Sequence, residues 1–182
     1  MAYWENCLDE LGRLIRKIVQ AYYEVKEVVF KHLADYHLWA GWKMRELLST
    51  LEAEEFSEEV MGKSPRELVQ HIVLALETCF FFIEGEKDES VFDRVKRFPR
   101  QELLKRWEVL DTRLSHAIEE IPQDKIMVKH INEEPFEIDV IDFFLQYLIH
   151  TTHHRGQLAM ILSWKGLEVP GTDYLMFFGE NV

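Results

Sequence analysis

The stretch DVIDFFLQYLIHTTHHRGQLAMILSW, residues 139–164, decides the fold of this chain. Its apolar residues recur with the spacing of an amphipathic helix. Asp139 can cap the N-terminus of that helix, and Asp142 places a negative charge in the first turn, where the helix dipole favours it. Gly166 and Pro170 follow shortly afterwards, as is typical beyond the end of a helix. The sequence therefore predicts one long, well-delimited helix here.

The segment from about residue 25 to residue 51 predicts another long helix. Val29, Leu33 and Tyr36 begin a series of largely apolar residues at steps of three and four. Residues 4–18 repeat the pattern more weakly. They form either a separate helix or an extension of the next one, and the sequence leaves both alternatives open.

Two further helices lie between these segments. One begins at Ser64-Pro65-Arg66-Glu67, which has the form of a capping box with proline at the first helical position, and it ends at Gly85. The other fits residues 101–121, and Pro122 stops it because proline cannot continue a helix.

The connections differ from one another in character. Residues 86–97 are rich in charge and predict a loop, whereas residues 125–138 alternate in polarity and predict a short hairpin or extended cover. Four long amphipathic segments joined in this way favour an all-α four-helix bundle. We expect two units, an N-terminal helical extension at 1–24 and the bundle domain at 25–182.

The charge balance narrows the classes of partner. The chain carries 21 Lys and Arg against 33 Asp and Glu, a formal net charge of −12. Such a chain is repelled by phosphate backbones and by anionic membrane surfaces. We therefore expect no nucleic-acid or membrane partner, and instead a cation or small ligand admitted to a shielded pocket.

Features that would point to export are not visible. The two cysteines, Cys7 and Cys79, lie far apart and define no disulfide framework. The first residues lack a basic segment followed by an apolar run, and the apolar stretch at 79–83 is far too short to span a membrane. The expected location is the cytoplasm.

The segment His150-Thr151-Thr152-His153-His154 is the strongest signal of chemistry. On a helix, residues four apart differ in direction by only about 40°, so His150 and His154 lie on one face and can chelate one metal ion. His153 points about 100° away from His154. The pair His150 and His153 is the geometrical alternative.

A third ligand has to come from another helix, and His71 is the best candidate. It follows Leu68 by three residues, on the side of the helix that is expected to face the interior, and it directly precedes the apolar run 72–76. Burying a charged imidazolium there would be costly, whereas a neutral imidazole bound to a metal avoids that cost. His32, His37, His116 and His130 are weaker candidates.

Three stretches of the chain resemble the DinB/YfiT-like family of metal-dependent proteins. The most specific is His150 to Gln157 with Gly166 to Tyr174 behind it. The segment 64–71 resembles the family's stretch that bears the first ligand. Residues 36–40 are similar to the aromatic "YNxWAN" stretch, with His37 in place of the usual asparagine and Gly41 where a second asparagine is common.

The resemblance implies a fold, a site and an activity. It implies a four-helix bundle with a long crossover, a metal held by His71, His150 and His154, and a homodimer. It also implies a transferase or isomerase that uses a low-molecular-weight thiol, in a family named for damage-inducible expression and so linked to stress response. It covers about residues 29–178 and leaves the N-terminal segment unexplained.

The hypothesis that follows is transfer of such a thiol to an electrophilic small molecule. Three neutral imidazoles leave the ion its full charge and an open position. Zinc or nickel suits them first, and iron or copper are alternatives. A non-catalytic metal-binding stress or interaction protein is the second hypothesis, and a metal-dependent hydrolase is the third. No general base is identifiable: Glu77 lies on another face from His71, and Arg155 is expected to anchor a neighbouring carboxylate. Gly156 is expected to permit close approach of another helix, and Gln157 to make either a packing or a functional hydrogen bond.

Overall fold

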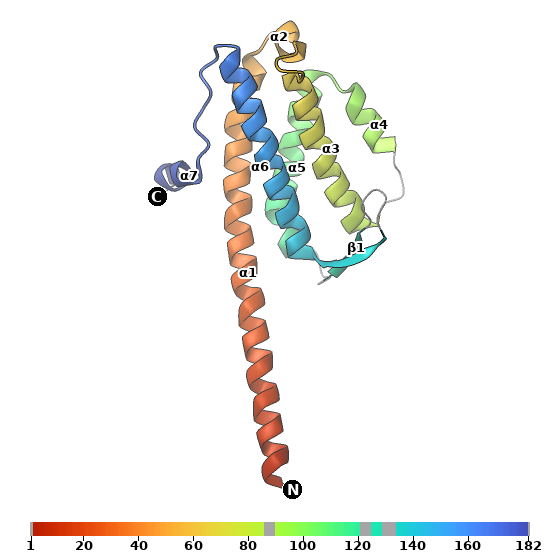
Figure 1. Cartoon of the computed structure of the whole chain (residues 1–182), viewed down its shortest axis with the longest axis vertical. Helices are drawn as coiled ribbons and strands as arrows, with labels where there is room; N and C mark the ends of the chain where they lie inside the picture. The colour runs from red at the N-terminus through yellow and green to blue at the C-terminus, as the bar shows by residue number, and fades with distance from the viewer. Residues whose placement is uncertain (1, 86–89, 121–124, 129–133, 182) are drawn as a thin grey trace.

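The computed structural model describes residues 2–85, 90–120, 125–128 and 134–181. Its framework is a bundle of four long helices: α1 (Ala2–Thr50), α3 (Pro65–Glu84), α5 (Arg100–Glu120) and α6 (Val140–Trp164) (Figure 1). The helices α5 and α6 each pack against both α1 and α3. Since α1 and α3 therefore lie diagonally, the chain crosses over between them, and the predicted all-α bundle with a crossover is confirmed.

Short elements lie at the ends and along the sides of the bundle (Figure 1). They are α2 (Ala53–Ser57), α4 (Ser90–Arg97), α7 (Tyr174–Asn181), β1 (Lys125–Val128) and β2 (Phe136–Asp139). The two strands pair antiparallel, with Ile126 opposite Ile138, which confirms the predicted hairpin. Residues 129–133 between them lie outside the described residues, as does Pro122.

The core lies between the four long helices. Burial of apolar side chains on one face of each helix is what holds such a bundle together. The largest side chains with almost no exposure come from α1, α2, α3, α5 and α6 together: Phe30, Met44, Leu48, Phe56, Ile72, Leu76, Trp107, Leu110 and Phe144. The core is thus continuous from end to end of the bundle.

Helix boundaries follow from the local chemistry that the sequence predicts. Ser64 Oγ accepts a hydrogen bond from the backbone N–H of Glu67, and the Glu67 carboxylate accepts one from the N–H of Ser64, which completes a capping box. Gly85 ends α3 in the left-handed region at φ 62°. Asp139 accepts from the N–H of Ile141 and caps α6.

The first helix is much longer than the bundle. It runs without interruption from Ala2 to Thr50, so residues 4–18 extend the next helix rather than forming one of their own. Its N-terminal half projects away from the other helices (Figure 1). Among the described helices, none is both long and apolar enough to cross a membrane.

Two predictions of detail are wrong. Residues 90–97 were expected to be loop and instead form α4, which packs on α3 through contacts such as Phe92 with Phe81, whose ring centroids lie 5.4 Å apart. Gly156 was expected to allow a helix to approach closely. It is exposed, and a Cβ added there would meet nothing within 4 Å.

Candidate metal centre

The three predicted ligands converge on one point. His71 comes from α3, and His150 and His154 come from successive turns of α6. One ring nitrogen of each imidazole lies within 4.8 Å of those of the other two. The ring centroids are 4.3 Å apart for His71 and His154, 4.6 Å for His150 and His154, and 5.1 Å for His71 and His150.

The spacing of these nitrogens fits a divalent ion. His71 Nε2 and His150 Nε2 lie 3.1 Å apart. Tetrahedral coordination with Zn–N distances of about 2.0–2.1 Å separates ligand nitrogens by about 3.3 Å. The group contains imidazoles alone, and no carboxylate from the described residues joins it. The site is open on one side, because His71 is exposed and the other two are half-buried. This set can hold one metal ion and leave a position free.

The lowered pKa values of two of the histidines also favour metal binding. Partial burial lowers the pKa of His71 below its ordinary value, and the charges of His154 and Lys63 lower it further. Burial likewise lowers the pKa of His150, with smaller contributions from the neighbouring histidines. Since a metal binds the neutral imidazole, both residues are ready to coordinate at neutral pH.

Gln157 orients one of the three imidazoles. Its Oε1 accepts a hydrogen bond of 2.8 Å from His154 Nδ1. Because Nδ1 then carries the proton, Nε2 of His154 is left with its lone pair facing the cluster. The Nε2 of Gln157 donates to His153 Nε2 at 3.0 Å. The sequence alone leaves open whether Gln157 makes a packing hydrogen bond or a functional one, because the outcome depends on the rotamer of His154.

The remaining histidines do not join the group. His153 is exposed and binds Gln157, so the alternative pair His150 and His153 is not the set that the fold assembles with His71. His32 packs against aromatic rings of α7, and His116 is exposed on α5. His130 lies outside the described residues.

A buried polar network lies behind the site, and sequence reasoning missed it. His37 on α1 is 1% exposed, and its Nε2 donates to Asp111 Oδ1 of α5 at 3.0 Å. The other carboxylate oxygen of Asp111 accepts from Arg45. On the opposite side of the ring, Arg155 Nη1 donates to His37 Nδ1 at 2.7 Å. Burial lowers the pKa of His37, against the opposing effect of Asp111, so the neutral ring both donates and accepts.

This network corrects the expectation for Arg155. Its guanidinium donates hydrogen bonds to His37 Nδ1 and Thr152 Oγ1, and the Asp111 carboxylate lies on the other side of the His37 ring. Arg155 directly follows His154 on α6 and is 3% exposed, so its contacts fix this turn of the helix against α1. Gly41 makes room for the network, because a Cβ there would collide with the carboxylate of Asp111.

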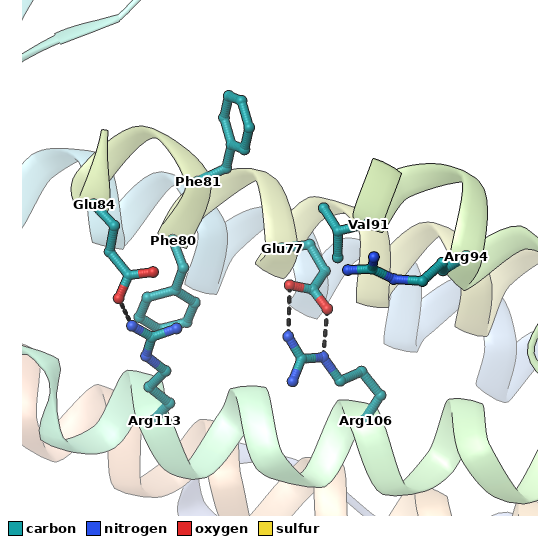
Figure 2. A pocket seen from close by; sticks show the side chains of 8 residues that line it. All are labelled: Glu77, Phe80, Phe81, Glu84, Val91, Arg94, Arg106 and Arg113. Carbon is teal, nitrogen blue, oxygen red and sulfur yellow. Dashed lines mark hydrogen bonds and ion pairs between the residues drawn. The ribbon is translucent and has the colours of Figure 1, made fainter. Parts of the chain in front are cut away.

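Glu77 belongs to a different face of α3. Its carboxylate accepts hydrogen bonds from Nε and Nη2 of Arg106, in a cleft between α3, α4 and α5 that Arg94 and Arg113 also line (Figure 2). A carboxylate held in such a two-pronged ion pair is not available as a base at the histidine cluster. This arrangement agrees with the expectation that Glu77 lies on another face of the helix from His71.

Two solved structures with a similar fold come from Bacillus cereus and Exiguobacterium sibiricum. A DinB-like protein from Bacillus cereus ATCC 10987 superposes with a TM-score of 0.55 at 18% identity, over 72% of this chain and 89% of that one. A DinB-family protein from Exiguobacterium sibiricum 255-15 gives a TM-score of 0.60 at 17% identity, over 78% of this chain and 95% of that one. A comparison with curated proteins found no match.

The comparison with family models covers most of the chain. The model described as "DinB family" matches residues 21–180, which include α3, α5, α6, the part of α1 from residue 21 onward and each histidine of the cluster. Residues 2–20, which belong to the projecting part of α1, lie outside the match. The sequence match, the bundle and the placement of the histidines agree, and the chain belongs to the DinB family.

Proposed function

We propose that this protein holds a divalent metal ion at His71, His150 and His154 and transfers a low-molecular-weight thiol to an electrophilic small molecule. The observation that carries the proposal is the convergence of three imidazoles from two helices around a position open to solvent. A three-histidine site of this form is typical of catalytic rather than structural zinc.

The chemistry needs a thiolate, and the site favours one. A bound divalent ion with neutral ligands lowers the pKa of a thiol or water in its open position. In the transfer, the S–H proton passes to solvent, the sulfur lone pair forms a bond to the electrophilic carbon, and the leaving group departs with the electrons of the bond that breaks. Lys63, whose charge contributes to lowering the pKa of His71, adds a positive field that favours the anionic sulfur.

The chain's own described thiol does not compete for this role. Cys79 is fully buried on α3, and burial raises the pKa of its thiol well above the ordinary value. A buried neutral thiol is a poor nucleophile. The proposal therefore assigns the reacting sulfur to a small-molecule substrate.

Hydrolysis is less well supported by the donor set. A hydrolase of this type needs a carboxylate beside the open position to take the proton of the attacking water. Among the described residues no carboxylate shares the histidine cluster, and Glu77 is occupied by Arg106. Thiol transfer has no such requirement, because a thiol loses its proton to solvent far more easily than water does.

The experiment loads the purified protein with zinc or nickel and follows thioether formation between a panel of small thiols and a chlorinated nitroarene. We expect the loaded protein to exceed the metal-free protein by at least about 100-fold, equivalent to about 2.7 kcal/mol of barrier. His71→Ala and His154→Ala should lose both metal and activity. His116→Ala, an exposed histidine outside the cluster, is the matched control.

Two other results would contradict this proposal. If the protein binds one equivalent of metal tightly but shows no turnover with any thiol, the transferase proposal fails and the non-catalytic metal-binding role takes its place. If His71→Ala binds metal as well as the wild type does, the three-histidine site itself is wrong.

A further inference from the structure

The projecting half of α1 carries a broad apolar stripe that the bundle does not cover. Eight large apolar side chains on this part of the helix are between 48% and 70% exposed. They are Leu14, Ile15, Ile18, Val19, Tyr22, Val25, Val28 and Val29. Together they expose on the order of 800 Å², the area that each partner contributes to a standard-size interface. A surface of this size is typical of a protein contact.

The spacing of the stripe is that of a coiled coil. Its central line follows residues 11, 15, 18, 22, 25 and 29, at alternating steps of four and three. Sustained over several turns, this repeat favours packing against another helix of the same period. Charged and polar residues occupy the other side of the helix: Arg13, Arg16, Lys17, Gln20, Glu24 and Glu27.

The stripe is separate from the face that α1 buries in its own bundle. Phe30, Ala34 and His37, which are almost completely buried, begin the bundle-facing line. That line is offset by one residue from the stripe, or about 100° around the helix. Extended toward the N-terminus, it meets Glu27 and Tyr23 instead of an apolar series. The projecting half is thus apolar on a side that the other bundle helices leave exposed.

Helix α7 already occupies the continuation of the stripe. The next positions of the repeat are His32, Tyr36 and Trp39, allowing for a drift of about 20° per heptad. All three contact α7: the ring centroid of His32 is 4.9 Å from that of Phe178, and those of Tyr36 and Trp39 are 6.0 and 5.7 Å from that of Phe177. This side of α1 therefore accepts a helix where the chain provides one, and among the described residues no helix covers the stripe before residue 30.

We propose that the N-terminal half of α1 pairs antiparallel with the same segment of a second copy of this chain. A parallel pair would bring the two α7 helices into the same space, because both lie on the stripe just beyond Val29. An antiparallel pair places the two bundles at opposite ends and leaves both α7 helices undisturbed.

The length of the uncovered stripe determines which residues of the two copies lie opposite each other. With Ile15 opposite the partner's Ile18, residue 11 lies opposite residue 22, and the partner's Ala2 reaches the level of Lys31. The next residue, His32, is where α7 begins to cover α1. A shift by one further heptad would drive the partner into α7. The uncovered length therefore matches one antiparallel partner, about 42 Å of helix.

Charge favours a second copy over a membrane surface. An amphipathic helix that lies on anionic lipid is attracted by basic residues on its polar side. Here that side mixes Arg16 and Lys17 with Glu24 and Glu27, on a chain whose net charge is −12. Pairing between two copies of the chain needs only the apolar stripe, and each copy carries the same stripe.

Sedimentation equilibrium of the full chain tests the pairing. We expect a dimer for the wild type and a monomer for the double variant Ile15→Glu with Ile18→Glu, with an unchanged circular dichroism signature of the bundle. The matched control is Lys17→Glu with Gln20→Glu on the polar side, which should remain a dimer. A monomeric wild type, a dimeric stripe variant, or wild-type binding to anionic vesicles in place of self-association would overturn the proposal.

Cysteine cross-linking in a Cys7→Ser background tests the direction. In the antiparallel register Val25 lies opposite Leu8, so Val25→Cys combined with Leu8→Cys should form a disulfide between copies. Val25→Cys alone should not, because the two Val25 positions then lie about 25 Å apart along the helices, far beyond the reach of a disulfide. Efficient cross-linking of Val25→Cys alone would show a parallel pair and refute the arrangement.

Discussion

At the scale of single residues, the histidine cluster depends on groups that touch no metal. His154 can present Nε2 to an ion only while its Nδ1–H has an acceptor, and Gln157 provides that acceptor at 2.8 Å. The two residues lie one turn apart on α6, so the rigid helix fixes their relative position. Gln157 therefore sets the tautomer and the ring orientation of a ligand.

Replacing Gln157 by alanine should weaken metal binding by about 10–100-fold, the usual effect of losing such a partner. Gln157→Glu should retain most of the affinity, because its carboxylate still accepts from Nδ1. Titration calorimetry with zinc measures both variants. His153→Ala is the control, since it removes the other partner of Gln157. Equal affinities for Gln157→Ala and Gln157→Glu would show that the hydrogen bond does not matter.

The same cluster gives metal binding a defined pH dependence. The folded-state pKa values of His71 and His150 lie below the ordinary value of 6.5. Protons on these two residues therefore compete with the metal mainly below pH 6.5, and the affinity for zinc should change little between pH 7 and pH 8. We expect a midpoint of loss below pH 6.5, measured with a competing chelator corrected for its own protonation. A midpoint above 6.5 would contradict the lowered pKa values.

In the metal-free protein, the lowered pKa values also determine how the free energy of unfolding changes with pH. Because the unfolded histidines bind protons first as pH falls, the free energy of unfolding is at its full value above pH 6.5 and decreases as pH falls through the folded-state pKa values. His37, whose pKa burial also lowers, acts in the same direction.

At the scale of helices, the buried network of His37, Asp111, Arg45 and Arg155 joins α1, α5 and α6. Asp111 is completely buried, and its carboxylate accepts hydrogen bonds from both His37 and Arg45. Removing it would leave buried positive charge without a counter-ion, which is more costly than losing a surface ion pair.

Asp111→Ala should reduce the free energy of unfolding by about 3–5 kcal/mol. The matched control on the same helix is Glu108→Ala. Its partner Lys105 is exposed, and an ion pair of this kind contributes only about 0–1 kcal/mol. Urea unfolding followed by circular dichroism compares the two variants. A similar small loss for both would mean that the network contributes nothing beyond a surface pair.

Much of the helical architecture and two of the ligands could be predicted from local sequence. Caps such as Ser64 and Asp139 act within one turn of chain, and the four-residue step of His150 and His154 needs only a helix. Helix α4 could not be predicted in this way, because its support is tertiary: Gln70 Nε2 donates to the carbonyl of Lys96 near its end.

The buried network escaped prediction for a related reason. Asp111 follows the inward-facing Leu110 and looks like the polar edge of a helix face. Its hydrogen-bond partners Arg45 and His37 are 66 and 74 residues away in sequence. Only the assembled bundle therefore shows that their side chains contact the Asp111 carboxylate. Gly41, where the family often has asparagine, was a visible departure, but its meaning depends on the carboxylate that it faces.

At the scale of the whole molecule, the candidate metal centre joins two helices, α3 and α6, that lie far apart in the sequence. His71 lies in the second turn of α3, and His150 and His154 lie 79 or more residues later on α6. Because the unfolded chain does not hold these residues together, an ion that binds all three stabilises the folded state by mass action.

Zinc at 100 times its dissociation constant should raise the free energy of unfolding by about 2.7 kcal/mol. For a chain of this size that corresponds to an increase in Tm of about 5–11 °C. Differential scanning calorimetry with zinc and then with excess chelator measures the shift and its reversal. His154→Ala should show almost none of it, whereas His116→Ala, with its histidine outside the cluster, should behave as the wild type does. An equal shift in the wild type and in His154→Ala would mean that zinc acts elsewhere on this acidic chain, since only binding that spans α3 and α6 needs that imidazole.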